Sequence, residues 1–401
     1  MTDNATMTTW QMYRSLLFSV YLPSFFMSIC QGSILLVLPL FSLKLGASAG
    51  LAAAVFSLRG LGNMCVDVPA GYAAARLGDK YTMLVGVGVM AVTGMLAGNA
   101  HSPAQLAVAA LLFGGAMSTW LLARLTHISE AVPTHHRGKA ISTMAGLQRF
   151  GNLLGPVVSG FVAQKYGYGQ VFIGIAVIAA CCFGLVIFGV RDNKRGHHEA
   201  SPNLVKLVPH ILGNHHRIFL TAGVAILFLT ILRAGRQLLI PLWGHGLHLN
   251  PADIGLVMGI AAGVDMTMFP MAGYMMDNWG RKFAAVACIG GLSLGIVLVP
   301  FTQGFLTLTL AAIIAGLGNG LGSGINMTLG ADFAPPRERG EFLGVWRLTG
   351  DSGSFAGPIM MGYIANTFVL ATAFTVTAGL GVIGMLIMIF LVKETLQKSS
   401  T

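Results

Sequence analysis

Long apolar runs separated by short polar connections dominate the chain. Twelve of the runs are long enough to cross about 30 Å of hydrocarbon as helices. We expect them at 16–41, 48–71, 82–99, 104–127, 140–163, 169–190, 217–242, 252–274, 283–302, 304–331, 341–365 and 368–392. Runs this long and continuous predict helices, because barrel strands are short and alternate between polar and apolar residues. The pattern therefore predicts an all-α membrane protein with twelve transmembrane helices.

The second half of the chain repeats the first at an offset of 202 residues. The matched pairs include Pro39 and Pro241, Gly71 and Gly273, Gly78 and Gly280, Lys80 and Lys282, Arg137 and Arg339, and Pro156 and Pro358. Several kinds of residue at one offset predict a duplication. We expect six-helix halves at 1–190 and 217–401, joined by a cytoplasmic linker at 191–216. Six spans per half make the two repeats parallel.

Composition and charge support a membrane location. The chain is 55% hydrophobic and 9% charged, whereas a soluble domain carries about 25% charged residues. With the N-terminus inside, the outer loops contain only Lys44 and Lys165, and the inner segments contain all the other loop lysines and arginines. This positive-inside bias predicts cytoplasmic termini and a bacterial inner (plasma) membrane. It also accounts for most of the net charge of +10 without a nucleic-acid partner.

Charged residues concentrate in two inner turns at equivalent positions of the repeat. The second turn contains Gly273, Asp277, Gly280, Arg281 and Lys282, and the first contains Gly71, Arg76, Gly78, Asp79 and Lys80. The fourth and tenth spans leave the membrane through Glu130 and Arg137, and through Asp332 and Arg339. Clusters of this kind can latch a helical bundle on the cytoplasmic side. The first copy differs, because Ala75 replaces the acid and Asp79 replaces a cation.

Both turns, together with the acid-x-x-Pro-x-x-x-Arg-Gly exits, resemble the major facilitator superfamily along the whole chain. This resemblance implies a cytoplasmic gate at the two turns and transport by alternating access around a central site between the halves. A further motif in the fifth span, Gly151, Gly155, Pro156 and Gly160, is similar to that of the proton-coupled drug-efflux branch and implies export. These small residues predict a smooth, kinkable helix face that packs closely against the other half.

Ionisable residues inside the predicted spans are candidates for transport, since each costs about 2.5–3.5 kcal/mol at mid-membrane. Asp351 is our first candidate for a proton-coupling group. It is the symmetry mate of Arg149 and lies four residues after Arg347 on the same helix face. Asp265, in the middle of the eighth span, is the second candidate, and Asp67, near an inner end, is the third. Static ion pairs are the alternative reading of all three.

Arginines outnumber acids inside the spans, so the predicted interior is cationic. The candidates for substrate contacts are Arg59, Arg149, Arg233, Arg236 and Arg347, with Gln31 and Asn319 as further polar contacts. Because guanidinium groups bind carboxylates and phosphates in forked geometry, this composition favours an anionic or zwitterionic substrate.

Other chemistries find little support in the sequence. The five cysteines lie in apolar spans, and the histidine pairs lack zinc spacing. No Walker-type loop is present, so we do not expect ATP-driven transport. We expect no metal, cofactor or enzymatic activity. We expect a monomer in the lipid bilayer that couples protons to efflux of a small amphipathic compound, which can be anionic. The alternatives are proton-coupled uptake of an organic anion, a lipid or lysolipid flippase, and a transport-inactive sensor or scaffold.

Overall fold

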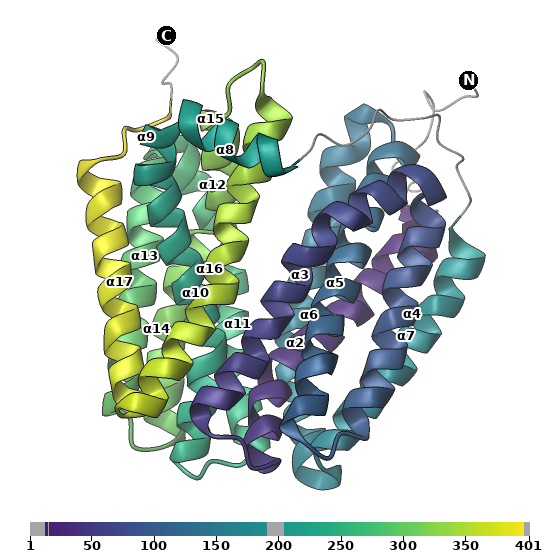
Figure 1. Ribbon diagram of the computed structural model, residues 1–401, viewed down its shortest axis with the longest axis vertical. Coiled ribbons are helices and arrows are strands. Elements are labelled where there is room, and N and C mark those ends of the chain that lie inside the picture. Colours follow the sequence, from purple (N-terminus) through teal and green to yellow (C-terminus); the bar gives the residue numbers. More distant parts are fainter. Residues whose placement is uncertain (1–12, 15, 191–203, 397–401) are drawn as a thin grey trace. The chain divides into compact units, whose positions relative to one another are not determined.

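The computed structural model describes residues 13–14, 16–190 and 204–396, which are mostly helical (Figure 1). No β-strand occurs in this described part of the chain. The first half contains η2 (Leu17–Tyr21), α2 (Leu22–Lys44), α3 (Ala49–Leu77), α4 (Asp79–Gly98), α5 (Pro103–Ala131), α6 (Thr134–Tyr166) and α7 (Tyr168–Gly189). The second half contains α8 (Leu204–Asn214), α9 (His216–Ile218), η3 (Phe219–Gly223), α10 (Val224–Gly246), α11 (Pro251–Thr267), α12 (Phe269–Asn278), α13 (Arg281–Leu298), η4 (Val299–Phe301), α14 (Phe305–Leu321), α15 (Ile325–Phe333), α16 (Arg339–Thr367) and α17 (Leu370–Phe390).

These helices form the twelve membrane-length segments that the sequence predicts, with short turns joining some of them. Among the described residues, ten segments are both long and apolar enough to cross a membrane. The other two are α6 and α16, which contain 33 and 29 residues and are equivalents in the repeat. They carry Arg149, Arg347 and Asp351. Helices of this composition require contact with protein or water along one face, because lipid cannot satisfy their polar groups.

Contacts divide the chain into two compact units, one of Met1–Gly46 with Leu58–Ser201 and one of Ala47–Ser57 with Pro202–Thr401. Each unit is described by itself. Within the first unit, α2 packs on α6 and α7, and α4 packs on α5 and α7. Within the second unit, α10 packs on α16 and α17, and α13 packs on α14 and α17 (Figure 1). These are equivalent helix pairs, so the duplication extends from sequence to packing.

Local backbone features also recur at the 202-residue offset. The π-helical turns η2 and η3 occupy equivalent residues. Gly78 and Gly280, which precede α4 and α13, both have positive φ, at 86° and 112°. Gly114 on α5 faces the carbonyl of Arg59 on α3, and Gly316 on α14 faces the carbonyl of Ala261 on α11. A side chain at either glycine would collide with backbone, so both copies depend on the same close approach of helices.

The glycine motif of α6 packs differently from our expectation. A Cβ added to Gly151 would lie 2.7 Å from the carbonyl oxygen of Phe25, and one added to Gly155 would lie 2.5 Å from that of Ile29. Both partners belong to α2 of the same unit, and Pro156 also lies beside α2, at Gly32. The prediction that Gly151 and Gly155 face the other half is therefore wrong. These glycines permit backbone contact within one unit.

Part of the predicted linker, 191–203, lies outside the described residues. The described part contains α8, where Ile211 is fully buried in the core of the second unit and Leu207 and Val208 pack against that core. His215, which follows α8, lies 3.2 Å from the carboxylate of Glu338 at the start of α16. The apolar face of α8 therefore lies on protein, and the linker ends as part of the second unit.

Candidate functional site

Four of the polar residues predicted inside the spans meet in the second unit. Nδ2 of Asn319 on α14 donates to Oδ2 of Asp265 on α11, at 2.5 Å. Nη2 of Arg236 on α10 lies 3.5 Å from the same carboxylate oxygen. Nε of Arg233, one turn earlier on α10, donates to Oδ1 of Asn319 at 2.9 Å, and Nη2 donates to the carbonyl of Gly322 at 3.0 Å. We call Arg233, Arg236, Asp265 and Asn319 the four-residue network.

The network lies near mid-membrane and is mostly shielded from solvent. Asp265 and Asn319 are near the middle of the spans Pro251–Asn278 and Phe305–Phe333. The side chains of Arg236 and Asp265 are only 14% and 13% exposed. A buried carboxylate requires charge or hydrogen-bond partners, and here it has both.

The geometry changes the role expected for two arginines. Arg233 and Arg236 direct donors at Asn319, a backbone carbonyl and Asp265. These contacts all lie within the protein. In this conformation Arg236 therefore binds the carboxylate of Asp265, and Arg233 binds the side chain of Asn319 and a backbone carbonyl after α14. The cationic interior that the sequence suggested is thus partly balanced within the unit.

The equivalent positions of the first copy are uncharged. Subtracting 202 places Gln31 opposite Arg233, Ile34 opposite Arg236, Asn63 opposite Asp265, and Met117 opposite Asn319. The backbone arrangement is shared, yet the charges occur in the second copy only. A purely structural requirement of the fold would apply to both copies, so these charges indicate a task specific to the second unit.

Asp351, our first candidate for proton coupling, lies in a more open environment. Its carboxylate is 3.5 Å from Nε of Arg347, in an i,i+4 pair along α16. The side chains of Arg347 and Asp351 are 48% and 33% exposed. An i,i+4 pair with this exposure contributes little energy. The geometry therefore favours Asp265 over Asp351.

The remaining predicted residues lie in the first unit. Asp67 on α3 accepts a hydrogen bond from the hydroxyl of Ser118 on α5. Arg59 lies two turns earlier on α3, with its Nε buried. Arg149 on α6 and Gln31 on α2 are half-buried.

Sequence reasoning missed a fully buried arginine on α5. Arg124 is 1% exposed, and none of its three guanidinium nitrogens has a hydrogen-bond partner among the described residues. Its guanidinium carbon lies 6.0 Å from the centre of the Trp120 ring, one turn away. The only available signal was a cation within an apolar run, at a position that we assigned to the exit from the fourth span.

The charged turn between α12 and α13 of the second copy forms a connected cluster. Arg281 bridges three partners, with Nε 3.4 Å from Asp332, Nη1 4.0 Å from Asp277, and Nη1 donating to the carbonyl of Met276 at 2.8 Å. Asp277 is 77% exposed, so Asp332 is the closer and more buried acid. We call Met276, Asp277, Arg281 and Asp332 the Arg281 cluster. Gly273 lies one turn before it on α12, and Arg339 is exposed at the start of α16.

Glu394, which the sequence did not single out, completes this turn. Its carboxylate accepts from the backbone N–H groups of Arg281 at 2.9 Å and Lys282 at 3.1 Å, the first residues of α13. A carboxylate in this position satisfies orphan donors and complements the helix dipole. Gly280 has a φ of +112°, which side chains other than glycine rarely adopt, and this favours glycine there.

The first copy has different contacts in its turn. Asp79 is buried and accepts from the hydroxyl of Thr126 at 3.0 Å. Arg76 stacks over the ring of Tyr72 at 4.5 Å. Nε of Arg137 donates to the carbonyl of Val132 at 3.1 Å. The other residues predicted for this gate are near these contacts in sequence, at Gly71, Gly78, Lys80 and Glu130. The acid displaced to Asp79 thus contacts α5.

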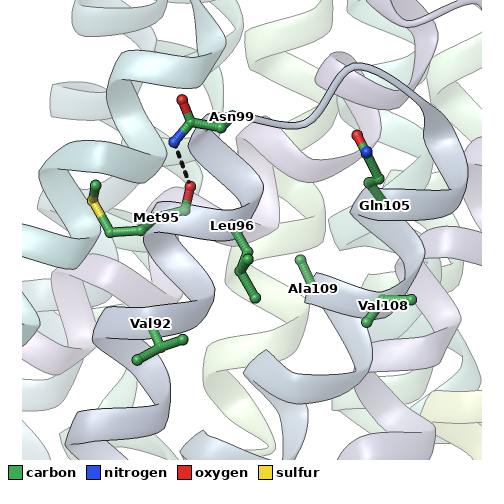
Figure 2. A pocket seen from close by; sticks show the side chains of 7 residues that line it. All are labelled: Val92, Met95, Leu96, Asn99, Gln105, Val108 and Ala109. Atoms are coloured by element: carbon green, nitrogen blue, oxygen red, sulfur yellow. Dashed lines mark hydrogen bonds between the residues drawn. The ribbon is translucent and has the colours of Figure 1, made fainter.

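A pocket of about 560 Å³ lies elsewhere in the first unit, between α4 and α5 (Figure 2). Its lining residues are Val92, Met95, Leu96, Asn99, Gln105, Val108 and Ala109. It contains no charged group, and Nδ2 of Asn99 is bonded to the carbonyl of Met95 at 2.8 Å. Val92 and Val108 are more than half exposed. We regard this pocket as part of the apolar surface, separate from the four-residue network. The described residues contain no cluster of His, Cys, Asp or Glu suited to a metal ion.

A bundle of membrane-length helices, with a charged network at mid-span and a charged turn at one end, defines a multi-pass transport protein rather than an enzyme. The model of the Major Facilitator Superfamily matches residues 20–235 and again 225–401. The chain therefore belongs to this superfamily, and the two matches reproduce its two halves.

Relatives and solved structures agree with this assignment. The chain is 27% identical over 352 residues to the multidrug resistance protein MdtG of Salmonella choleraesuis (strain SC-B67), covering 85% of this chain and 86% of the relative. The MdtG protein of Salmonella typhi is 26% identical with the same coverage. The nucleoside transporter NupG has a TM-score of 0.76 at 15% identity, covering 94% of this chain and 98% of NupG. A D-xylose–proton symporter has a TM-score of 0.72 at 17% identity, covering 94% of this chain and 98% of its own. At these identities the structural matches establish the fold alone.

Proposed function

We propose that the protein is a proton-coupled antiporter that exports small amphipathic compounds, and that Asp265 carries the coupling proton. Its site opens alternately to the two sides of the membrane. We place it in a bacterial inner membrane as a monomer with cytoplasmic termini. The matching relatives are named for multidrug resistance, and the glycine motif of α6 is similar to that of efflux proteins. Both favour export.

One observation supports the coupling role above all others. Asp265 is a buried carboxylate that shares Oδ2 between a guanidinium and an amide, from two different helices. Protonation weakens its interaction with Arg236, so the two protonation states favour different arrangements of α10, α11 and α14. A proton gradient can thus bias the conformational equilibrium.

The test uses purified protein in proteoliposomes with an imposed pH gradient. Rhodamine 6G is the cationic probe and carboxyfluorescein the anionic probe, since they share a xanthene ring system and differ in charge. We expect pH-driven accumulation in the wild type, its loss in Asp265→Asn, and its retention in Asp351→Asn. Exchange of labelled for unlabelled probe without a gradient should persist in Asp265→Asn, because that reaction requires no net proton movement.

Retained pH-driven transport in Asp265→Asn would show that this carboxylate is not the coupling group. The direction follows from comparing inward and outward gradients in vesicles of known orientation. Transport that dissipates the gradient while probe moves against it supports antiport. Probe movement with the proton would instead support the uptake alternative.

A further inference from the structure

Two membrane spans of the second unit are broken beside the four-residue network. α11 ends at Thr267 and α12 begins at Phe269 with Pro270 in its first turn, where proline cannot donate a backbone hydrogen bond. α14 ends at Leu321, and α15 begins after Gly324, whose φ is +83°. The equivalent helices of the first copy, α3 and α5, continue without interruption. The breaks are therefore a property of the second unit.

The last turns of the two helices that precede the breaks contact each other at the backbone of Asp265. A Cβ on Gly320 would lie 2.6 Å from the carbonyl oxygen of Asp265 and 2.6 Å from Cβ of Met268. Thus the last turn of α14 rests on the last turn of α11. A change in position of either helix end must be felt by the other, because no space separates them.

The same guanidinium contacts the coupling network and the α14 break. Arg233 donates through Nε to the side chain of Asn319 and through Nη2 to the carbonyl of Gly322. Asn319 in turn donates to Asp265. Gly322 lies within the turn that separates α14 from α15. A chain of hydrogen bonds therefore runs from the carboxylate to the carbonyl at the helix break.

The two short helices beyond the breaks are joined at the Arg281 cluster. α12 supplies the carbonyl of Met276 and α15 supplies Asp332, and Arg281 binds both. The side chain of Arg281 is 19% exposed, so this bridge is partly shielded from solvent. α12 and α15 thus form a pair, with a helix break at one end and a shared guanidinium at the other.

We propose that Arg233 and Asn319 are positioning residues that link the protonation state of Asp265 to the break between α14 and α15. The proposal rests on the function proposed above. With Asp265 ionised, the carboxylate holds Asn319 and, through it, Arg233 and the Gly322 carbonyl. Addition of one proton to the carboxylate weakens this hold, and α12 and α15 then swing as a pair about the two breaks. Among the described residues, the titratable or charged groups that interact with Asp265 include Arg236 from α10 and Cys288 from α13, and both of these interact with Arg233.

A matched pair of glycine variants tests the hinge. Gly324 and Gly167 both have positive φ, at 83° and 92°. A Cβ on Gly324 would meet only Met276, at 3.9 Å, and one on Gly167 would meet nothing within 4 Å. Gly324 lies in the left-handed region, with ψ of −11°, whereas Gly167 has ψ of 162°, a region that essentially only glycine adopts, so alanine costs at least as much backbone energy at Gly167 as at Gly324. We expect Gly324→Ala to slow transport about tenfold, equivalent to about 1.4 kcal/mol in the barrier, and Gly167→Ala to leave the rate near that of the wild type. Equal rates in the two variants would overturn the hinge.

A label on α15 tests the link to Asp265. In a chain without its native cysteines, a cysteine introduced at Met327, which is 79% exposed, carries an environment-sensitive fluorophore. A second sample carries it at Phe390 of α17, which is 76% exposed. We expect the Met327 signal to change between neutral and acidic buffer while the Phe390 signal stays constant. Asn319→Ala should abolish the pH response, and Asn250→Ala, at an exposed asparagine outside the network, should preserve it.

The outcomes separate this inference from the proposed function. If Asp265→Asn abolishes pH-driven transport but the label at Met327 ignores pH in the wild type, the function stands and the link is wrong. If Asn319→Ala keeps the wild-type pH profile of transport, Asn319 has no positioning role. Partial recovery of the pH response in Asn319→Gln, which retains an amide, supports the role and distinguishes it from simple loss of packing.

Discussion

Arg236 and Asp265 provide the sharpest energetic test of the four-residue network. At 3.5 Å and an effective dielectric constant of about 20, their direct attraction is about 5 kcal/mol. Removing one partner of a fully buried pair costs about 3–5 kcal/mol. Since both side chains retain some exposure, we expect Asp265→Asn and Arg236→Gln each to lower the free energy of unfolding by about 2–3 kcal/mol. Each variant leaves one charge in a largely dry site.

The double variant Asp265→Asn/Arg236→Gln should be more stable than the sum of the single losses predicts. Removing both charges eliminates the unpaired ion, so we expect a coupling of about 1–2 kcal/mol. The assay is thermal unfolding of purified protein in one detergent. The melting temperature of a unit of this size shifts by about 2–4 °C for each kcal/mol of change in stability. Strictly additive losses would refute an energetically significant pair.

Three further outcomes are expected from thermal unfolding of the same preparations. Gly155→Ala should destabilise by about 1–3 kcal/mol because its Cβ meets the backbone of α2; Gly146→Ala, on the same helix with nothing within 4 Å, should be neutral or stabilising. Arg124→Met should raise stability by about 1–3 kcal/mol, since it removes buried donors without partners, and a lower melting temperature would indicate a partner for Arg124. Glu394→Ala should cost about 0.5–1 kcal/mol through loss of the α13 cap, whereas Glu394→Asp should lose less if the carboxylate itself is responsible.

Apolar run length and the 202-residue offset were sufficient to predict the helical architecture. The twelve segments follow from the need to satisfy the backbone in lipid, which acts on each run separately. Apolar run length predicted α6 and α16 as well, at 140–163 and 341–365, although their glycines and charges lower the hydropathy of the window. Their equivalent positions in the repeat support that prediction.

The candidate site was only partly predictable. Arg233, Arg236, Asp265 and Asn319 were recognisable as polar residues in apolar spans, but their mutual contacts depend on the packing of α10, α11 and α14. Asp351 was ranked first because an i,i+4 partner is visible in sequence, whereas partners on other helices are not.

Two other features could be recognised only in the structure, for the same reason. The full burial of Arg124 depends on which face of α5 meets its neighbours. The break at Gly324 depends on a backbone angle that three closely spaced glycines, Gly320, Gly322 and Gly324, permit but do not require.

The repeat also records an order of events in the history of the chain. Features present in both copies, such as the π-helical turns and the glycine contacts of α5 and α14, were inherited from the single ancestral unit. Features present in one copy, such as the Arg236–Asp265 pair and the broken spans, arose or were lost after the fusion. The shared helical scaffold is therefore older than the present differences between the two halves. An ancestor rebuilt from the shared positions alone should fold as a six-helix unit that assembles in pairs.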